Sequence, residues 1–386
     1  MMKTAGEAKK SNERLSGPEA LRCVAMLLVT VLHYLGKGGL LPSLAAEGYT
    51  PEATGTFAYL LESFAIVAVN CYILLSGYFQ GTGPVKLSRL VKLYIRFYLF
   101  SVIVGLLCAA FGAVPAGGLT LHYFLTLFFP VVMGHYWFMT AYFLFYLVMP
   151  LVGAALRRLS AEQTGVVLAG MLLFHCILKT LLPFYLEITT DGYDWTWYFT
   201  VFLLGAYARK RDWAFLKKRS TCLILYVAGC LLTFGRVYGL WFVYRKTGAC
   251  GALISQSLDY NQLTVVAAAL GLFGVFLHLE GPATKFLGKV APYTLGVYLL
   301  QENVGLRYLW QPLLGSGRVG GVLSLLLHVL AAVCVMFILG VLADYLRSLL
   351  QNGLQMLLLK TPVFRGLRDR IWKVDAVLAE DTEKER

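Results

Sequence analysis

Apolar residues fall into ten segments, each long enough to cross a membrane as a helix. The hydrocarbon core of a bilayer is about 30 Å thick, which corresponds to around 20 helical residues. The sixth segment is short and has the least certain limits. The pattern predicts an all-α, polytopic membrane protein with about ten transmembrane helices, near residues 20–36, 57–79, 90–113, 136–155, 164–184, 195–209, 221–241, 262–280, 290–310 and 320–346.

Basic residues alternate between the loops of the two sides. Cytoplasmic loops are enriched in Lys and Arg, and here one side collects 27 of them and the other 6, with Lys179 inside a segment. An even number of spans with both the N- and the C-terminus cytoplasmic explains this split. The chain is therefore expected to be a multi-pass protein surrounded by membrane lipids.

The rest of the chain divides around this membrane domain. Residues 1–19 are predicted to be a cytoplasmic leader, 20–350 the transmembrane domain and 351–386 a cytoplasmic tail. Within the tail, residues 364–377 are expected to form a basic amphipathic helix that lies on the membrane. The apolar stretch 121–132 is interpreted as interfacial or re-entrant.

The composition supports the membrane interpretation and excludes several functions. Of 386 residues, 58% are apolar and 14% are charged. The net charge is +13, and the basic residues lie mostly in short loops between apolar segments. This distribution is typical of membrane topology and does not indicate a nucleic-acid partner. The eight cysteines have no CxxC spacing and are interpreted as packing residues. Phosphate-loop, His-Glu-x-x-His and Gly-x-Ser-x-Gly motifs are missing, so ATP hydrolysis, zinc-peptidase and soluble-hydrolase chemistry have no support.

The first segment carries a cation and an imidazole on one face. Arg22 and His33 are eleven residues apart, so on a helix their directions agree to within roughly 20° and they lie about 16 Å apart. Ionisable groups inside a membrane are unfavourable and often functional. The pair is expected to mark the two ends of a polar path through the lipid, although His33 alone is equally compatible with a structural role.

The second segment contains Glu62, Asn70 and the pair Ser76-Gly77. Glu62 and Asn70 are candidates for substrate binding. Small residues commonly allow close helix packing, so packing is the simplest explanation for Ser76-Gly77.

The third segment begins with cations three to four residues apart, a spacing that stacks side chains along one face of a helix. Positive-inside topology alone accounts for basic residues here. A cationic face that runs into the membrane also suits the phosphates of a nucleotide-bearing cofactor. The residues are Lys86, Arg89, Lys92 and Arg96.

The ninth segment has an unusual density of polar side chains. A purely structural membrane helix seldom carries five in ten residues. Lys179, His175 and His135 are weaker candidates, better explained by packing or by a boundary position. The five are Tyr298, Gln301, Glu302, Asn303 and Arg307.

Four blocks of the sequence together resemble the integral-membrane acyltransferase-3 family, which O-acylates bacterial surface polysaccharides and related glycans. The first is the Arg-x10-His pattern from Arg22 to His33, and the second joins Leu75–Phe79 with Arg89-x-x-Lys92. The remaining two are Tyr136-Trp137-Phe138 with Tyr142, Tyr146 and Pro150, and the stretch from Thr294 to Arg307.

The resemblance implies a bacterial cell-membrane enzyme that takes an acyl group, usually acetyl, from cytoplasmic acyl-CoA without a metal. His33 would be the general base and Arg22 would steady the donor or the transition state. The acceptor would be a glycan or a polyprenyl-linked saccharide. Donor-binding candidates are Ser76, Lys86, Arg89, Lys92 and Arg96, and substrate-binding candidates are Glu62, Asn70, Trp137, Tyr142, Tyr298, Gln301, Glu302, Asn303 and Arg307.

The chain departs from the family pattern at one point. Many relatives have His-Asp-Asn where this chain has Gln301-Glu302-Asn303. An amide donates and accepts hydrogen bonds but takes no proton at neutral pH. Proton transfer would then depend on His33.

Two other functions fit parts of the pattern. A transporter or flippase for a polyprenyl-linked saccharide or another polar solute would use Arg22, Glu62, Lys179 and Glu302 to line a solute route. A membrane sensor or assembly component leaves the Arg22–His33 register unexplained. The pattern specifies neither the acceptor nor an oligomeric state.

Overall fold

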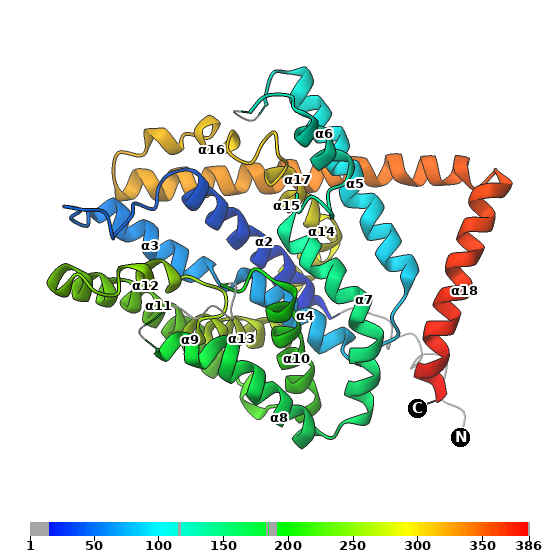
Figure 1. The fold of residues 1–386 in the computed structure, drawn as a ribbon, viewed down its shortest axis with the longest axis horizontal. Helices are drawn as coiled ribbons and strands as arrows, with labels where there is room; N and C mark the ends of the chain where they lie inside the picture. Colours follow the sequence, from blue (N-terminus) through cyan, green and yellow to red (C-terminus); the bar gives the residue numbers. More distant parts are fainter. Residues whose placement is uncertain (1–14, 115–116, 183, 185–190, 385–386) are drawn as a thin grey trace.

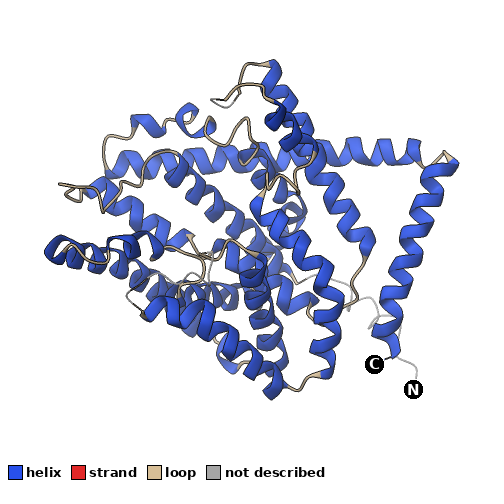
Figure 2. Cartoon of the chain, viewed as in Figure 1, coloured by secondary structure: helices blue, strands red, loops and turns tan. Residues whose placement is uncertain are grey.

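The computed structural model describes residues 15–114, 117–182, 184 and 191–384, and this part of the chain is entirely helical (Figures 1 and 2). The predicted all-α class is therefore confirmed. Most of the predicted leader lies outside the described residues, and α2 begins at Ser16. The helices are α2 Ser16–Lys37, α3 Ala53–Ala65, α4 Ala68–Gln80, α5 Leu87–Ala110, α6 Leu121–Phe128, α7 Trp137–Arg158, α8 Ala161–Leu172, η1 Leu173–Ile177, α9 Leu178–Leu181, α10 Trp195–Arg211, η2 Ala214–Lys217, α11 Arg219–Thr247, α12 Gly251–Gln256, α13 Leu263–Leu277, α14 Pro282–Val290, η3 Ala291–Tyr293, α15 Leu295–Gln301, α16 Trp310–Leu313, η4 Ser316–Arg318, α17 Val322–Leu358 and α18 Pro362–Lys384.

Seven helices in the described residues are long and apolar enough to cross a membrane, or eight if the bent pair α13 and α14 forms one span. They are α2, the joined α3 and α4, α5, α7, the run from α8 to α9, α11 and α17. The sixth predicted segment is α10, which has only 17 residues. The count of about ten spans and the cytoplasmic position of both termini remain predictions.

The apolar character of the bundle extends to its outer surface. Large side chains such as Leu323, Leu327 and Ile338 of α17 are each more than half exposed. A soluble protein rarely leaves so broad an apolar surface in water. This surface therefore suits contact with lipid. All eight cysteines are free and six are buried, as expected for packing residues.

Helix α2 lies at the centre of the bundle (Figure 1). It packs against α3, α4, α13, α14, α15 and α17. Its residues Leu21, Ala25, Met26 and Val29 belong to the main hydrophobic core. Because so many helices contact it, a polar side chain on α2 faces other helices more often than lipid.

The ninth predicted segment differs from the continuous helix expected over 290–310. Helix α15 ends at Gln301, and turns follow. The Asn303 side chain accepts a hydrogen bond from Gly305 N at 3.1 Å, while its carbonyl accepts from Leu306 N and Arg307 N at 2.8 and 2.9 Å. An Asn side chain that bonds to nearby backbone competes with helix formation. The segment still follows α2, since Tyr34 Oη donates to Leu314 O at 3.1 Å.

The two segments outside the main spans form helices as well. Helix α6 has eight residues, too few to cross a membrane, which agrees with the interfacial or re-entrant prediction for 121–132. Helix α17 continues past the predicted domain end at residue 350 to Leu358. Helix α18 then covers the predicted amphipathic stretch 364–377 and lies beside α5 (Figure 1).

Helices α4 and α10 approach each other closely at two glycines. A Cβ atom on Gly77 would lie 2.0 Å from the Phe202 carbonyl oxygen, and one on Gly205 would lie 2.5 Å from Leu74 O. Both neighbours are backbone atoms, which cannot move without moving a helix. The packing interpretation of Gly77 is thus confirmed, and it fixes the adjacent Ser76 in place.

Gly77→Ala is expected to destabilise the protein by about 1–3 kcal/mol, because overpacking forces the backbones apart. Gly170→Ala is the matched control, since a Cβ on Gly170 in α8 meets nothing within 4 Å. Thermal denaturation of both purified variants in the same detergent measures the difference. Equal midpoints for the two variants would contradict the packing argument.

Candidate functional site

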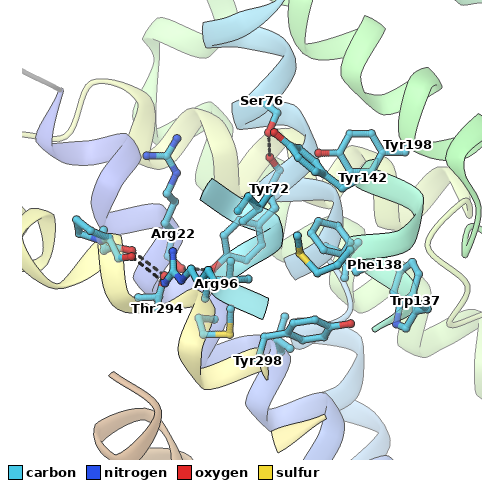
Figure 3. A pocket seen from close by; sticks show the side chains of 18 of the residues that line it. Arg22, Tyr72, Ser76, Arg96, Trp137, Phe138, Tyr142, Tyr198, Thr294 and Tyr298 are labelled. Atoms are coloured by element: carbon cyan, nitrogen blue, oxygen red, sulfur yellow. Dashed lines mark hydrogen bonds between the residues drawn. The ribbon is translucent and has the colours of Figure 1, made fainter. Parts of the chain in front are cut away.

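The central feature of the bundle is a cavity of about 290 Å³ between α2, α4, α5, α7, α10 and the segment from η3 to α15. Figure 3 shows Arg22 and Arg96 with Thr294 on one side of it and aromatic rings, among them Tyr142 and Trp137, on the other. Seven of the residues singled out from the sequence line it, namely Arg22, His33, Ser76, Arg96, Trp137, Tyr142 and Tyr298. The others lie elsewhere.

One face of α2 forms a wall of this cavity. Arg22, Met26, Val29 and His33 all line it, at the spacing of three to four residues that places side chains on one helix face. Their positions extend about 16 Å along the helix axis. The predicted polar path with Arg22 at one end and His33 at the other therefore corresponds to a cavity.

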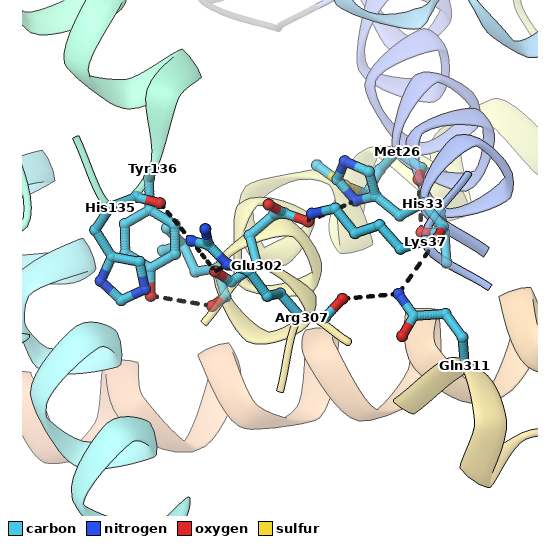
Figure 4. Close-up of polar contacts among 10 residues, drawn as sticks. Met26, His33, Lys37, His135, Tyr136, Glu302, Arg307 and Gln311 are labelled. Carbon is cyan, nitrogen blue, oxygen red and sulfur yellow. Dashed lines mark hydrogen bonds and ion pairs between the residues drawn. The ribbon is translucent and has the colours of Figure 1, made fainter. Parts of the chain in front are cut away.

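His33 lies against a carboxylate at its end of the cavity (Figure 4). Its Nδ1 atom is 3.3 Å from Glu302 Oε1, and its side chain is 16% exposed. The same carboxylate forms an ion pair with Lys37, one turn further along α2. The Tyr298 ring centroid is 6.3 Å from that of His33, and the Tyr298 hydroxyl has no hydrogen-bond partner among the described residues.

The turn after α15 is what brings Glu302 to His33. Arg307 Nη2 donates to Glu302 O at 2.9 Å and to His135 O at 2.7 Å, so it ties this turn to the residues before α7 (Figure 4). Asn303 Nδ2 contacts Tyr136 Oη at 3.4 Å. Arg307 and Asn303, which were candidates for substrate binding, therefore hold the turn together and do not line the cavity.

His135 has a structural role in the same region. Its Nε2 atom accepts a hydrogen bond from Val304 N at 2.9 Å, so Nδ1 carries the proton and donates to Ser101 Oγ at 2.9 Å. Burial, together with the nearby Arg307 guanidinium, lowers the pKa of His135 to about 3. The ring is neutral and both of its nitrogens are bonded, as expected for the packing interpretation.

Gln301 is fully buried and does not line the cavity. Neither atom of its amide has a hydrogen-bond partner in the part of the chain that the structure describes. The charged group beside His33 is instead the carboxylate of the next residue, Glu302. The departure from the family pattern thus leaves a carboxylate, and no second histidine, against the His33 ring.

Arg22 and Arg96 are the two cations of the cavity, and each is paired. Arg22 forms an ion pair with Glu19 one turn earlier in α2. Arg96 donates from Nε to Asp344 Oδ1 at 3.0 Å and from Nη2 to Pro292 O at 2.9 Å, and Arg347 Nε reaches Asp344 Oδ1 at 2.6 Å. Asp344 is completely buried. This network fixes α5, α17 and η3 around one end of the cavity.

The predicted cationic face of α5 does not converge on one site. Among its four cations only Arg96 lines the cavity, whereas Lys92 lines a separate groove beside α18. Side chains four residues apart on a helix point in directions that differ by about 40°. This difference is enough for Lys92 and Arg96 to meet different neighbours. Arg89 is exposed, and the Lys86 backbone exchanges hydrogen bonds with the Tyr146 hydroxyl at 3.2 and 2.9 Å.

Asn70 and Glu62 lie behind the cavity wall. Asn70 Nδ2 donates to Tyr260 O at 2.7 Å and its Oδ1 accepts from Trp197 Nε1 at 3.1 Å. It therefore supports Tyr260, which does line the cavity. Glu62 is buried in α3, and its Oε2 atom has no hydrogen-bond partner among the described residues.

Lys179 belongs to a separate charged cluster. It is 3% exposed, forms ion pairs with Asp191 and Asp259, and lies 2.7 Å from an Asp259 oxygen. Burial raises the pKa of Asp259 to about 7, and the Lys179 ammonium opposes that rise. The cluster joins the end of α9 to the segments that precede α10 and α13, which agrees with a packing role for Lys179.

Sequence reasoning missed several residues of the cavity. Tyr198 is buried and Tyr72 is half-buried, and a hydrophobic pattern does not distinguish either ring from core, although Tyr72 lies one turn before Ser76 on α4. Tyr72 Oη donates to Arg22 O at 2.6 Å. Glu19 lies three residues before Arg22, a spacing that indicates an ion pair. Thr294 begins the last block of the family resemblance but was not a site candidate, and Tyr260 lies in a turn and gave no signal.

No group of three or more His, Cys, Asp or Glu side chains among the described residues is placed to hold a metal ion. One protein-family model matches the chain, over residues 15–345, and its description is an acyltransferase domain. The matched range runs from the start of α2 into α17 and stops before α18. Neither the curated proteins nor the solved structures gave a match.

Proposed function

The chain belongs to the acyltransferase-3 family. We propose that this membrane acyltransferase moves an acyl group, with acetyl as the expected one, from cytoplasmic acyl-CoA to a glycan hydroxyl. The acceptor is a cell-surface polysaccharide or a polyprenyl-linked saccharide. The observation that supports the proposal best is the position of His33. Its ring lines a cavity within the membrane domain, with a carboxylate against Nδ1 and a cation at the other end of the same helix face.

His33 is the proposed general base. A carboxylate beside Nδ1 favours the tautomer with the proton on that nitrogen, which leaves the Nε2 lone pair for chemistry. Nε2 removes the proton of the acceptor hydroxyl while its oxygen attacks the thioester carbonyl. The bond from carbon to sulfur then breaks, and the imidazolium returns the proton to the CoA sulfur. The products are an ester and the free CoA thiol.

Glu302 and Tyr298 assist this step. Glu302 holds the ring orientation and stabilises the imidazolium by its charge, as a carboxylate partner of a catalytic histidine does. Tyr298 lines the cavity with its ring near that of His33, and its buried hydroxyl has no hydrogen-bond partner among the described residues. It is the proposed donor to the oxygen that becomes negative, because a preorganised donor in a dry site stabilises such a charge strongly.

The two substrates occupy opposite ends of the cavity. Arg22, Ser76 and Arg96 lie near the donor, with Lys86 and Arg89 further toward the cytoplasm. The acceptor lies against Trp137, Tyr142 and other aromatic rings that line the cavity. Lys92 faces another groove and is left out of the proposed donor site.

The proposed topology follows the sequence. Both termini lie in the cytoplasm of a bacterial cell, and residues 20–350 form the enzyme. Acyl-CoA enters the cavity from the cytoplasmic side, at the end where α2 begins. Cysteines introduced at exposed loop positions and labelled from one side of the membrane test this orientation. Labelling of the loop after α7 from outside the cell would contradict it.

Thiol release tests the function. Purified protein in liposomes is supplied with acetyl-CoA and cell-envelope glycan, and we expect free CoA thiol to appear only with acceptor, together with a base-labile acetyl ester detected by mass spectrometry. A transporter would instead move solute without consuming thioester. Glycan flux at constant acetyl-CoA would therefore refute the enzymatic proposal.

Glu302→Gln is expected to lower kcat by about ten- to a hundredfold, because the imidazolium loses its neighbouring negative charge; partners of metal-binding histidines have effects in this range. The donor KM should stay unchanged, since Glu302 does not line the cavity. Glu302→Asp should recover part of the rate because it restores the charge.

The substitution also leaves Lys37 without its ion-pair partner. The double variant Glu302→Gln with Lys37→Met removes that unpaired charge and should recover stability while the rate stays low. If the double variant instead recovers full activity, Glu302 serves only to neutralise Lys37.

A further inference from the structure

A second groove lies outside the candidate active site, lined by α5, the end of α17 and α18. Figure 1 shows where these three helices lie in the fold. Its volume is about 290 Å³, close to the lower limit for pockets that take small ligands. Its lining is mainly apolar and comes from all three helices, including Val91, Ile95, Leu354, Leu367, Ile371 and Trp372.

Helix α18 is joined to the start of α5 by a hydrogen bond beside this groove. The Asp375 carboxylate accepts a hydrogen bond from Ser88 N in the first turn of α5 at 3.1 Å. Backbone N–H groups there have no partner within the helix, and the positive end of the helix dipole favours an anion. Together with the short connection from α17, this contact closes α18 over the groove.

Two cations line the groove, and no Asp or Glu does so in the described range. The Lys92 side chain makes no hydrogen bond or ion pair within the residues that the structure describes. Arg368 lies over the Trp372 ring at 4.6 Å and contacts the neighbouring Asp369 at 2.9 Å. The groove therefore has an apolar interior and a net positive edge, which matches a ligand with a hydrocarbon chain and an anionic head.

The apolar side chains around the groove remain accessible. Phe364, Leu367 and Trp372 of α18 are 42%, 53% and 57% exposed, and Leu354 of α17 is 46% exposed. Basic amphipathic helices with such a face lie in the membrane interface and attract anionic lipids. The helix also lies beyond residues 15–345, the range shared with the family.

We infer that this groove binds one anionic phospholipid of the leaflet next to α18, with an acyl chain in the groove and the phosphate between Lys92 and Arg368. On the proposed topology this is the cytoplasmic leaflet, which carries the anionic lipids. The lipid would fix α18 against α5. This inference does not depend on the acyl-transfer reaction.

Native mass spectrometry of the full-length protein tests the site. The protein is released from nanodiscs that contain equal amounts of phosphatidylglycerol and phosphatidylcholine, and we expect one phosphatidylglycerol to be retained preferentially. The variant Lys92→Gln with Arg368→Gln should bind it about thirtyfold more weakly, because each cation near a lipid surface contributes about fivefold to the affinity.

The control variant is Lys218→Gln with Arg219→Gln, which removes the same charge from exposed residues at the start of α11. It should retain the lipid as the native protein does. Ile371→Asn should weaken binding of both lipids, since it places a polar group in the groove.

Equal retention of phosphatidylglycerol by the groove variant and the control would overturn the inference. A raised KM for acyl-CoA in Lys92→Gln, with unchanged lipid retention, would also overturn it and return Lys92 to the donor site. Variants of the proposed active site that lose catalysis should still retain the lipid. The lipid proposal and the acyl-transfer proposal can therefore be refuted independently.

Discussion

Replacement of His33 by glutamine is expected to slow acyl transfer by about a hundred- to ten-thousandfold, the contribution typical of a positioned general base. Glutamine has a similar reach and donates hydrogen bonds, but it takes no proton at neutral pH. Glu302 keeps its ion pair with Lys37 in this variant, so the fold should survive. The rate of acceptor-dependent CoA thiol release measures the effect.

A second histidine provides the matched control. His328 in α17 is half-buried, bonds to Ser324 O at 2.8 Å and does not line the cavity. His328→Gln should therefore transfer the acyl group at the native rate. If His33→Gln keeps native turnover while its melting midpoint is unchanged, His33 is not the base.

Asp344→Asn is expected to destabilise the protein by about 3–5 kcal/mol, because loss of one partner leaves buried charge uncompensated. Asp344 is completely buried and accepts from Arg96 and Arg347 at once. The amide keeps the shape of the side chain but removes its charge, and one of its two terminal atoms becomes a donor that faces the arginines. Chemical denaturation of the purified protein in detergent measures the free energy of unfolding.

Glu162→Gln is the control for this substitution. Glu162 pairs with Arg211 on the surface, where both side chains are largely exposed, and exposed pairs contribute little. It should leave the unfolding midpoint unchanged. A similar midpoint for Asp344→Asn would mean that the pair with Arg96 adds nothing to stability.

The loss of Asp344 should also affect the cavity. Arg96 lines the cavity and its guanidinium is oriented by Asp344. Without that carboxylate, Arg96 has more rotamers, and the proposed donor should bind less tightly. A raised KM for acyl-CoA in the Asp344 variant would distinguish this effect from a loss of fold alone.

The register of one helix was predictable from the sequence. Arg22 and His33 had to share a face of α2 because eleven residues complete close to three turns. That the face would be turned inward followed from the cost of polar groups in lipid. The cavity beside both residues agrees with this prediction.

The cations of α5 illustrate the opposite case. A spacing of three to four residues places Lys92 and Arg96 on similar sides of the helix, but the neighbours decide what each one meets. Asp344 of α17 captures Arg96, and α18 forms a groove at Lys92. Both partners lie about 250 residues later in the chain or more, so no local pattern reveals them.

The sequence by itself determined that the chain is helical and apolar enough for a membrane, and that one helix presents a cation and an imidazole on the same face. Only the tertiary structure decided that Glu302 lies against His33, because the helix that was expected to carry it ends at Gln301. Helical periodicity follows from local geometry. The position of a turn between helices depends instead on distant partners. Here Arg307 donates hydrogen bonds both to the Glu302 carbonyl in the turn and to the His135 carbonyl before α7.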